Sequence, residues 1–206
     1  VLGLEHYKWC DRITPRHNVT LPFTRMLLGP MDYTPGGFRN VTPETYASRY
    51  DLPFVMGTRA HQLAMFVVYD SPLQMVADTP SAYRGEPAAD FLKVVPSTWD
   101  ETRVLAGQIG EYVAIARRHG RDWFIGAMTD APRKLELALP FLGAAAFEAT
   151  VYADAPDSAA APTHTAISRI HVAARENRPP LVLDLVRGGG AAVHLRAITD
   201  RSVPAK

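Results

Sequence analysis

The spacing of apolar residues changes near residue 96. Before it, the segment 58–77 has the apolar spacing of a buried helix, which Ser71-Pro72 would kink or restart. The segment 80–95 predicts a second helix, with Pro87 tolerated near the first turn of its second half. The first 95 residues therefore predict a mostly helical region with one or two strands.

Beyond residue 96 the apolar runs are short, and Gly, Asp or Pro bounds each of them. Leu135, Leu137 and Leu139 show the period of two that a strand requires. The tetrapeptide HGRD at 119–122 carries a hairpin signal between two such runs. Short strands that recur with turns between them are typical of a β-sandwich or barrel. The predicted strands are 104–105, 112–116, 123–128, 135–139, 147–152, 166–172, 180–186 and 191–198.

Two segments predict loops. Prolines and glycines interrupt residues 29–53, which follow a strand expected at 28–32, and loops of that length in compact domains are usually functional. Residues 154–162 are rich in Ala, Asp, Ser and Pro and form a second predicted loop. The stretch 19–36 joins an apolar helical run to a turn and then to a polar loop, as the last elements of a catalytic barrel do.

The composition bears on whether the chain binds nucleic acid or a membrane. The chain has 206 residues, of which 47% are hydrophobic and 21% charged, and its formal net charge is +1. These ordinary values give no electrostatic field that would recruit nucleic acid or an anionic membrane. The longest apolar run, 63–68, is far shorter than the roughly 20 residues that span a bilayer. We therefore expect neither nucleic acid nor a membrane as a partner.

The single cysteine and the first residues carry two further inferences. Cys10 has no second cysteine to pair with, which excludes an internal disulfide and a cysteine-based zinc site. The chain opens on Val1, and Glu5 follows four residues later without a signal or polar tail before it. We interpret the chain as a piece of a longer protein, from which a secretory signal would already be missing.

Candidate chemistry begins at Glu5. His6, Tyr7, Lys8 and Trp9 follow it, so that an acid lies among aromatic side chains. Carbohydrate sites pair a proton donor with sugar-stacking faces in this way. On spacing alone, the alternative is a solvated carboxylate beside a packed tryptophan, because exposed glutamate is the common case.

Other positions admit a structural and a functional interpretation side by side. Asp32-Tyr33 stands where a barrel strand would give way to its loop, so it is either a binding position or a turn cap. Asn18 belongs to an Asn-x-Thr sequon and also suits a helix N-cap. The segment 187–190 (RGGG) lacks the strand-to-helix context of a phosphate loop and favours a hairpin turn. Trp99 and Trp123 are candidate sugar platforms, with core packing as the favoured alternative.

Several of these segments match, in order, a known family. The chain resembles the C-terminal third of glycoside hydrolase family 97, the bacterial α-glucosidases and α-galactosidases. The resemblance implies α/β plus all-β architecture: the C-terminal part of a (β/α)8 barrel at residues 1–95, followed by a small antiparallel β-sandwich at 96–206. The matching segments are 3–7 (GLEHY), 18–25 (NVTLPFTR), 29–36 (GPMDYTPG), 96–102 (PSTWDET), 107–112 (GQIGEY), 116–118 (ARR), 123–129 (WFIGAMT) and 140–143 (PFLG).

The resemblance also implies roles for single residues. Glu5 holds the position of the family's general acid, which protonates the departing glycosidic oxygen and ligates calcium. His6, Trp9, Asp32 and Tyr33 fall where the oligosaccharide substrate is expected to bind. The second carboxyl group and the other Ca²⁺ ligands would come from missing N-terminal domains of a periplasmic or secreted parent. Because Ca²⁺ takes 6 to 8 oxygens, we expect the isolated chain neither to hold calcium tightly nor to cleave sugar.

Two rival interpretations stay open. The chain could act only as a carbohydrate-binding or structural β-sandwich, or be a gene fragment without function, because a partial barrel leaves strand edges unpaired and apolar faces uncovered. The residues leave open whether the parent inverts or retains configuration. They also leave open whether it prefers glucosides or galactosides.

Overall fold

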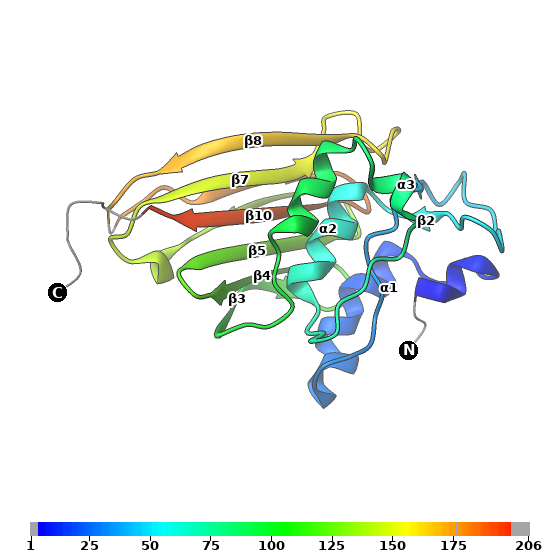
Figure 1. The fold of residues 1–206 in the computed structure, drawn as a ribbon, viewed down its shortest axis with the longest axis horizontal. Coiled ribbons are helices and arrows are strands. Elements are labelled where there is room, and N and C mark those ends of the chain that lie inside the picture. Colours follow the sequence, from blue (N-terminus) through cyan, green and yellow to red (C-terminus); the bar gives the residue numbers. More distant parts are fainter. Residues whose placement is uncertain (1–3, 176, 199–206) are drawn as a thin grey trace.

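The computed structural model describes residues 4–175 and 177–198, so the outermost residues of both predicted domains lie outside it. Up to residue 95 the chain forms short helices and two short strands (Figure 1). These elements are η1 (Leu4–Lys8), α1 (Pro15–Thr20), η2 (Leu21–Phe23), η3 (Arg25–Leu28), β1 (Asn40–Val41), β2 (Val55–Met56), α2 (Arg59–Val68), α3 (Pro80–Tyr83) and η4 (Pro87–Lys93).

The helix α2 is shorter than the predicted helix 58–77. Thr58 caps its start, because its side-chain oxygen accepts the backbone N–H of His61 at 3.1 Å. The helix ends at Val68, since Tyr69 turns to an extended conformation with ψ 134°. The prediction was therefore wrong beyond residue 68, where the approach to Ser71-Pro72 ends the helix instead of restarting it.

Two other predictions for this region were wrong. The expected helix 80–95 is divided into α3 and η4, because Gly85 between them has a φ of +79° that no helix allows. The expected strand at 28–32 does not form. Its Met31 N–H instead donates to the carbonyl of Asp70 at 2.9 Å, and the parallel pair of this region is β1 with β2.

Each predicted strand beyond residue 96 is confirmed, with shifted ends. The sandwich contains β3 (Glu101–Gln108), β4 (Tyr112–His119), β5 (Asp122–Thr129), β6 (Arg133–Leu137), η5 (Pro140–Leu142), β7 (Phe147–Asp154), β8 (Thr165–Val172), β9 (Leu181–Leu185) and β10 (Gly190–Ala197). An antiparallel six-stranded sheet has the order β3-β4-β5-β10-β7-β8, and β6 pairs with β9 in a second, two-stranded sheet. The hairpin at 119–122 is confirmed, since His119 pairs with Asp122 and Gly120 takes a positive φ of 58°.

The segment 187–190 forms a turn but not the predicted hairpin, because β9 and β10 belong to different sheets. Their crossing depends on Asp154 at the end of β7. One carboxylate oxygen of Asp154 accepts the backbone N–H groups of Val186 at 3.0 Å and Gly190 at 2.9 Å. A buried carboxylate thus holds both ends of the turn between the two sheets.

Both faces of the six-stranded sheet are covered by packed elements. The small sheet covers one face, where Leu135, Leu137, Leu183 and Leu185 join a core that includes Trp123. The helices α2 and η4 lie on the opposite face (Figure 1). All residues of α2 are buried, and the region before residue 96 therefore shares its core with the sheet.

Gly126 allows the close approach of α2 to the sheet. A Cβ at this position on β5 would lie 2.6 Å from the carbonyl oxygen of Ala64 and 2.9 Å from Cβ of Val67. Only a glycine fits so near another backbone. In the described part of the chain, no helix is both long enough and apolar enough to cross a bilayer.

Candidate functional site

Glu5 lies on η1, and its side chain is exposed. The carboxylate lines a pocket of about 230 Å³ that also includes Lys8, Thr34, Val55 and Asp78. An exposed acid beside a cavity can reach a ligand without moving the core. The structure therefore gives Glu5 an accessible position, which its proposed chemistry requires.

Hydrogen bonds from Tyr46 fix the turn that carries Glu5. The Tyr46 hydroxyl donates to the carbonyl of Tyr7 at 2.5 Å and to that of Cys10 at 2.7 Å, and the backbone N–H of Cys10 donates to the His6 carbonyl at 2.9 Å. The buried hydroxyl of Tyr7 donates to the carbonyl of Ile13. Tyr46 thus ties the Glu5 turn to the loop after β1, a link that the local sequence does not reveal.

His6 and Trp9 line a neighbouring, wider hollow of about 620 Å³ together with Tyr46. Trp9 is 49% exposed, its ring meets the His6 ring edge-on at 5.4 Å, and the Tyr50 ring lies 6.3 Å away. Tyr50 is itself 75% exposed. The exposed rings of Trp9 and Tyr50 suit stacking against a sugar. Sequence reasoning missed Tyr50, and Tyr46 in the hollow, because both lie about forty residues further along the chain.

The structure separates Asp32 and Tyr33. Asp32 is exposed, whereas Tyr33 is 2% exposed, and its hydroxyl donates to Oδ1 of Asn18 at 3.2 Å. Burial raises the pKa of Tyr33 well above its usual value. Thr34, the next residue, lines the Glu5 pocket. The substrate-binding roles of Asp32 and Tyr33 stay predictions, and Tyr33 lies in the core in this structure.

Asn18 belongs to a buried polar network and is not the predicted helix N-cap. Thr14 caps α1, and Asn18 lies inside that helix, fully buried. Its Nδ2 lies 3.3 Å from Nε2 of His61, and its backbone carbonyl accepts the Tyr69 hydroxyl at 2.9 Å. The other nitrogen of His61, Nδ1, lies 3.0 Å from the carbonyl oxygen of Gly189.

The partners of His61 fix its protonation. Burial lowers the pKa of His61 to about 4, so the ring is neutral near pH 7. The Gly189 carbonyl can only accept, so Nδ1 carries the proton and Nε2 accepts from the Asn18 amide. Together with the hydrogen bond of Thr58 Oγ1 to Asp154 at 2.6 Å, this network joins α1 and α2 to the sandwich.

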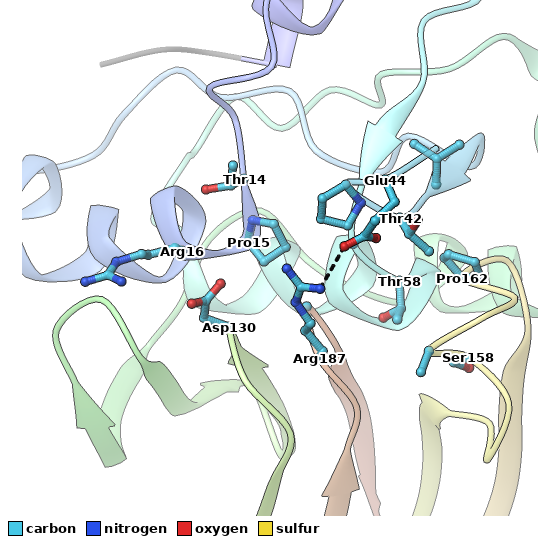
Figure 2. A pocket seen from close by; sticks show the side chains of 15 residues that line it. Thr14, Pro15, Arg16, Thr42, Glu44, Thr58, Asp130, Ser158, Pro162 and Arg187 are labelled. Carbon is cyan, nitrogen blue, oxygen red and sulfur yellow. Dashed lines mark hydrogen bonds and ion pairs between the residues drawn. The ribbon is translucent and has the colours of Figure 1, made fainter. Parts of the chain in front are cut away.

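A cleft of about 490 Å³ lies at the same junction (Figure 2). Arg187 and Glu44 form an ion pair across it at 2.9 Å, and both side chains are exposed. The hydroxyls of Thr58 and Ser158 are already used within the protein, since they donate to Asp154 and to the His164 carbonyl. We interpret the cleft as part of the contact between the helical region and the sandwich.

The two candidate tryptophans of the sandwich both contact other aromatic rings, and Trp123 is buried. Trp123 is 5% exposed and its ring lies 4.5 Å from that of Phe141. Trp99 is half-buried and meets Phe124 edge-on at 5.5 Å. Trp123 therefore packs in the core, as the core-packing alternative predicts, and Trp99 packs in part against the sheet.

The described residues do not by themselves fit a calcium ion. No three His, Cys, Asp or Glu side chains among them come together as a metal site. Asp78 shares the Glu5 pocket, but it forms an ion pair with Arg39 and accepts the backbone N–H groups of Phe38 and Thr79. A single free carboxylate supplies too few oxygens for Ca²⁺.

Known proteins with similar sequences identify the family to which this architecture belongs. Residues 98–196, which include β3 to most of β10, match the family model described as "Glycosyl-hydrolase 97 C-terminal, oligomerisation". The chain is 42% identical over 160 residues to a retaining alpha-galactosidase of Bacteroides thetaiotaomicron, covering 75% of this chain and 24% of that protein. It is 38% identical over 146 residues to a probable retaining alpha-galactosidase of Streptomyces bingchenggensis, covering 70% of this chain and 21% of that protein.

Solved structures agree with these sequences. A glycoside hydrolase family 97 enzyme from Pseudoalteromonas, in complex with acarbose, matches with a TM-score of 0.83 and 34% identity over 96% of this chain and 31% of that one. A beta-arabinopyranosidase matches with a TM-score of 0.70 and 26% identity over 92% of this chain and 28% of that one. The chain spans about a quarter of the length of the curated relatives it matches. It belongs to glycoside hydrolase family 97 and corresponds to the C-terminal region of that family's proteins.

Proposed function

We propose that this chain works as the C-terminal part of an exo-acting α-glycoside hydrolase, of α-glucosidase or α-galactosidase type, with Glu5 as general acid. The observation that carries the proposal is the exposed Glu5 side chain, which lines a pocket on the same short helix-and-turn segment that carries the exposed Trp9 ring. Support comes from the relatives, which are named alpha-galactosidases, and from the family 97 enzyme that binds acarbose. The substrate would be an oligosaccharide.

The first 95 residues are proposed to complete a (β/α)8 barrel. The parallel pair β1–β2 has only two strands in the described chain, and such a pair is not stable alone. Large apolar side chains elsewhere in these 95 residues also face solvent, namely Leu27 (78% exposed), Leu28 (85%), Leu73 (76%) and Met75 (53%). Exposed apolar surface of this kind favours contact with further protein. The preceding strands and helices of a barrel would cover it.

The proposed chemistry needs a second carboxyl group from outside this chain. Glycoside hydrolysis uses one carboxylic acid to protonate the departing oxygen and another as nucleophile or base, about 5 to 9.5 Å away according to the stereochemistry. Glu5 would be the first of these. The His6, Trp9 and Tyr50 rings would hold the sugar, and Asp32 would contact it from the following loop.

Calcium and location are proposed from the family resemblance. Glu5 would supply one oxygen to Ca²⁺ in the complete enzyme, and the remaining ligands would come from the other domains. A periplasmic or secreted location is proposed on the same ground. The isolated chain is expected to be inactive.

The test is Glu5→Gln in the full-length parent enzyme. With an aryl α-glycoside that has a poor leaving group, kcat/KM should fall about 10²–10⁴-fold, because that oxygen needs the proton. With a good leaving group the loss should be much smaller. Glu136→Gln on β6 is the matched control, since Glu136 is also an exposed glutamate. Equal losses with both substrates, or no loss, would remove Glu5 from the acid role.

A purely carbohydrate-binding module is the alternative. Trp123 is buried and Trp99 is half-buried against Phe124, so this alternative depends chiefly on the more exposed Trp9 and Tyr50. Titration of the isolated chain with maltose or melibiose, followed by tryptophan fluorescence, would favour it if Trp9→Phe abolished a saturable signal.

A further inference from the structure

The small sheet of β6 and β9 covers only part of the face on which it packs. Its strand β9 contacts β7 and β10, and no third strand of the described chain pairs beside it. Between β9 and the strands β7, β8 and β10 lies a groove of about 370 Å³. Its apolar lining includes Ala149, Ile170, Val172, Leu181, Val193 and Leu195. None of the residues that line this groove also lines the Glu5 pocket.

The floor of the groove belongs to the same face of the sheet as the core of the sandwich. Ile170 of β8 pairs with Ala149 of β7, a buried member of that core, so both side chains point to this face. Ile170 is nevertheless 42% exposed, so the groove is open to solvent there. Its volume falls at the lower end of the roughly 300–1,000 Å³ of small-molecule pockets, which are mostly apolar with a few polar groups.

Two prolines make the groove a poor site for an added peptide strand. Pro179 and Pro180 line it just before β9 begins at Leu181. A peptide that adds to a sheet gains its affinity from main-chain hydrogen bonds, and proline has no N–H to donate. The groove therefore favours a small apolar ligand over a peptide.

Two arginines add positive charge to this apolar groove. Arg175 and Arg178 lie in the loop between β8 and β9 and line the groove. The carbonyls of Gly143, Ala145 and Arg175 accept from Nη2 of Arg178 and fix its guanidinium. Its Nε and Nη1 have no acceptor, and neither arginine forms an ion pair with a carboxylate, among residues 4–175 and 177–198. Desolvation and the charge of Arg175 lower the pKa of Arg178, as expected for two neighbouring cations.

We propose that the groove binds a medium-chain carboxylate of the fatty-acid type, with its alkyl chain against Ile170 and its carboxylate at Arg175 and Arg178. The alkyl chain gains free energy from leaving water, in proportion to the number of methylene groups that are buried. The carboxylate forms charge-assisted hydrogen bonds with guanidinium and supplies the missing negative charge. A cationic amphiphile would instead add a third positive charge. This inference does not depend on the role of Glu5.

Calorimetric titration of the 206-residue chain with decanoate tests the proposal. Decanoate should bind saturably at one site. Decyltrimethylammonium has the same alkyl length and the opposite charge, and it should bind about tenfold or more weakly. Octanoate should bind roughly tenfold more weakly than decanoate, because it buries two fewer methylene groups.

Two substitutions with matched controls locate the ligand. Arg175→Glu should weaken decanoate binding about tenfold or more, whereas Arg169→Glu, at an exposed arginine on the other face of β8, should leave it unchanged. Ile170→Glu should weaken binding to a similar degree, because it places a negative charge in the apolar groove. Ile167→Glu is its control, since Ile167 is 41% exposed on the other face of the same strand. Thermal melting curves show whether each variant is folded.

Several results would overturn the proposal. They are the absence of saturable decanoate binding, equal binding of decanoate and decyltrimethylammonium, or an equal loss in a variant and its control. Binding to this chain but not to the full-length parent would show that another segment of the parent occupies the groove. If decanoate does not bind and Ile170→Glu lowers the sedimentation coefficient of the chain, the groove is instead a contact between copies.

Discussion

Removing the carboxylate of Asp154 is predicted to destabilise the contact between α2 and the sandwich. Asp154→Ala leaves the Thr58 hydroxyl and the backbone N–H groups of Val186 and Gly190 without their acceptor. A buried donor without a partner costs about 1–3 kcal/mol, and Val186 is only half-buried, so the free energy of unfolding should fall by about 3–6 kcal/mol. For a chain of this size that lowers Tm by roughly 6–24 °C.

Urea unfolding followed by circular dichroism and tryptophan fluorescence measures this loss. Asp154→Asn keeps one acceptor oxygen in nearly the same shape and should cost less than half as much. Asp184→Ala, at an exposed carboxylate on β9, is the control and should stay within about 0.5 kcal/mol of wild type. If Asp154→Ala unfolds at the same urea concentration as Asp184→Ala, the hydrogen bonds of Asp154 do not hold the junction.

The same site gives a pH dependence of defined sign. Burial raises the pKa of Asp154 from 3.8 to about 6, so the folded chain binds this proton more tightly than the unfolded chain. Its contribution to stability is complete below about pH 4 and is lost as pH rises through 6, a change of about 3 kcal/mol at most. The pKa of His61 is lowered to about 4, so its contribution is complete above about pH 6.5 and is lost as pH falls toward 4. The two dependences oppose each other.

The remaining predictions concern the components of that balance and the Glu5 turn. In Asp154→Asn only the His61 dependence remains, so the free energy of unfolding should fall as pH is lowered from about 6.5 to 4. In His61→Gln only the Asp154 dependence remains, so the free energy of unfolding should fall as pH rises over the same range. Urea titration at each pH measures both, and equal slopes in the two variants would refute the opposing dependences. Gly126→Val should abolish soluble folding or cost more than about 3 kcal/mol, because its Cβ meets the Ala64 carbonyl at 2.6 Å, and a wild-type melting curve would show that α2 can move away. Tyr46→Phe should speed amide hydrogen exchange in η1 without changing exchange in β5, and unchanged protection would show that the Tyr46 hydroxyl does not hold the Glu5 turn.

The alternation of apolar residues along each strand of the sandwich could be interpreted from the sequence, because each residue's face depends only on its neighbours two positions away. Leu135 and Leu137 are buried and Glu136 between them is exposed, as the period of two predicts. The order of the strands could not be obtained in this way. The strand β10 lies between β5 and β7, which are its partners over separations of about 40 to 70 residues.

The region before residue 96 shows the limit more clearly. Its apolar segments indicated helices, but the end of α2 and the break at Gly85 were decided by backbone geometry and packing. The sequence allowed Tyr33 to be a binding residue and Asn18 to be a sequon residue or a helix N-cap, yet in the structure both belong to one buried network with His61. The sequence by itself determined the family and the strand pattern, because both depend on the order of residues within short segments. Only the tertiary structure decided which polar groups are buried together and which part of a sheet face is left uncovered, because these depend on contacts between segments far apart in the chain.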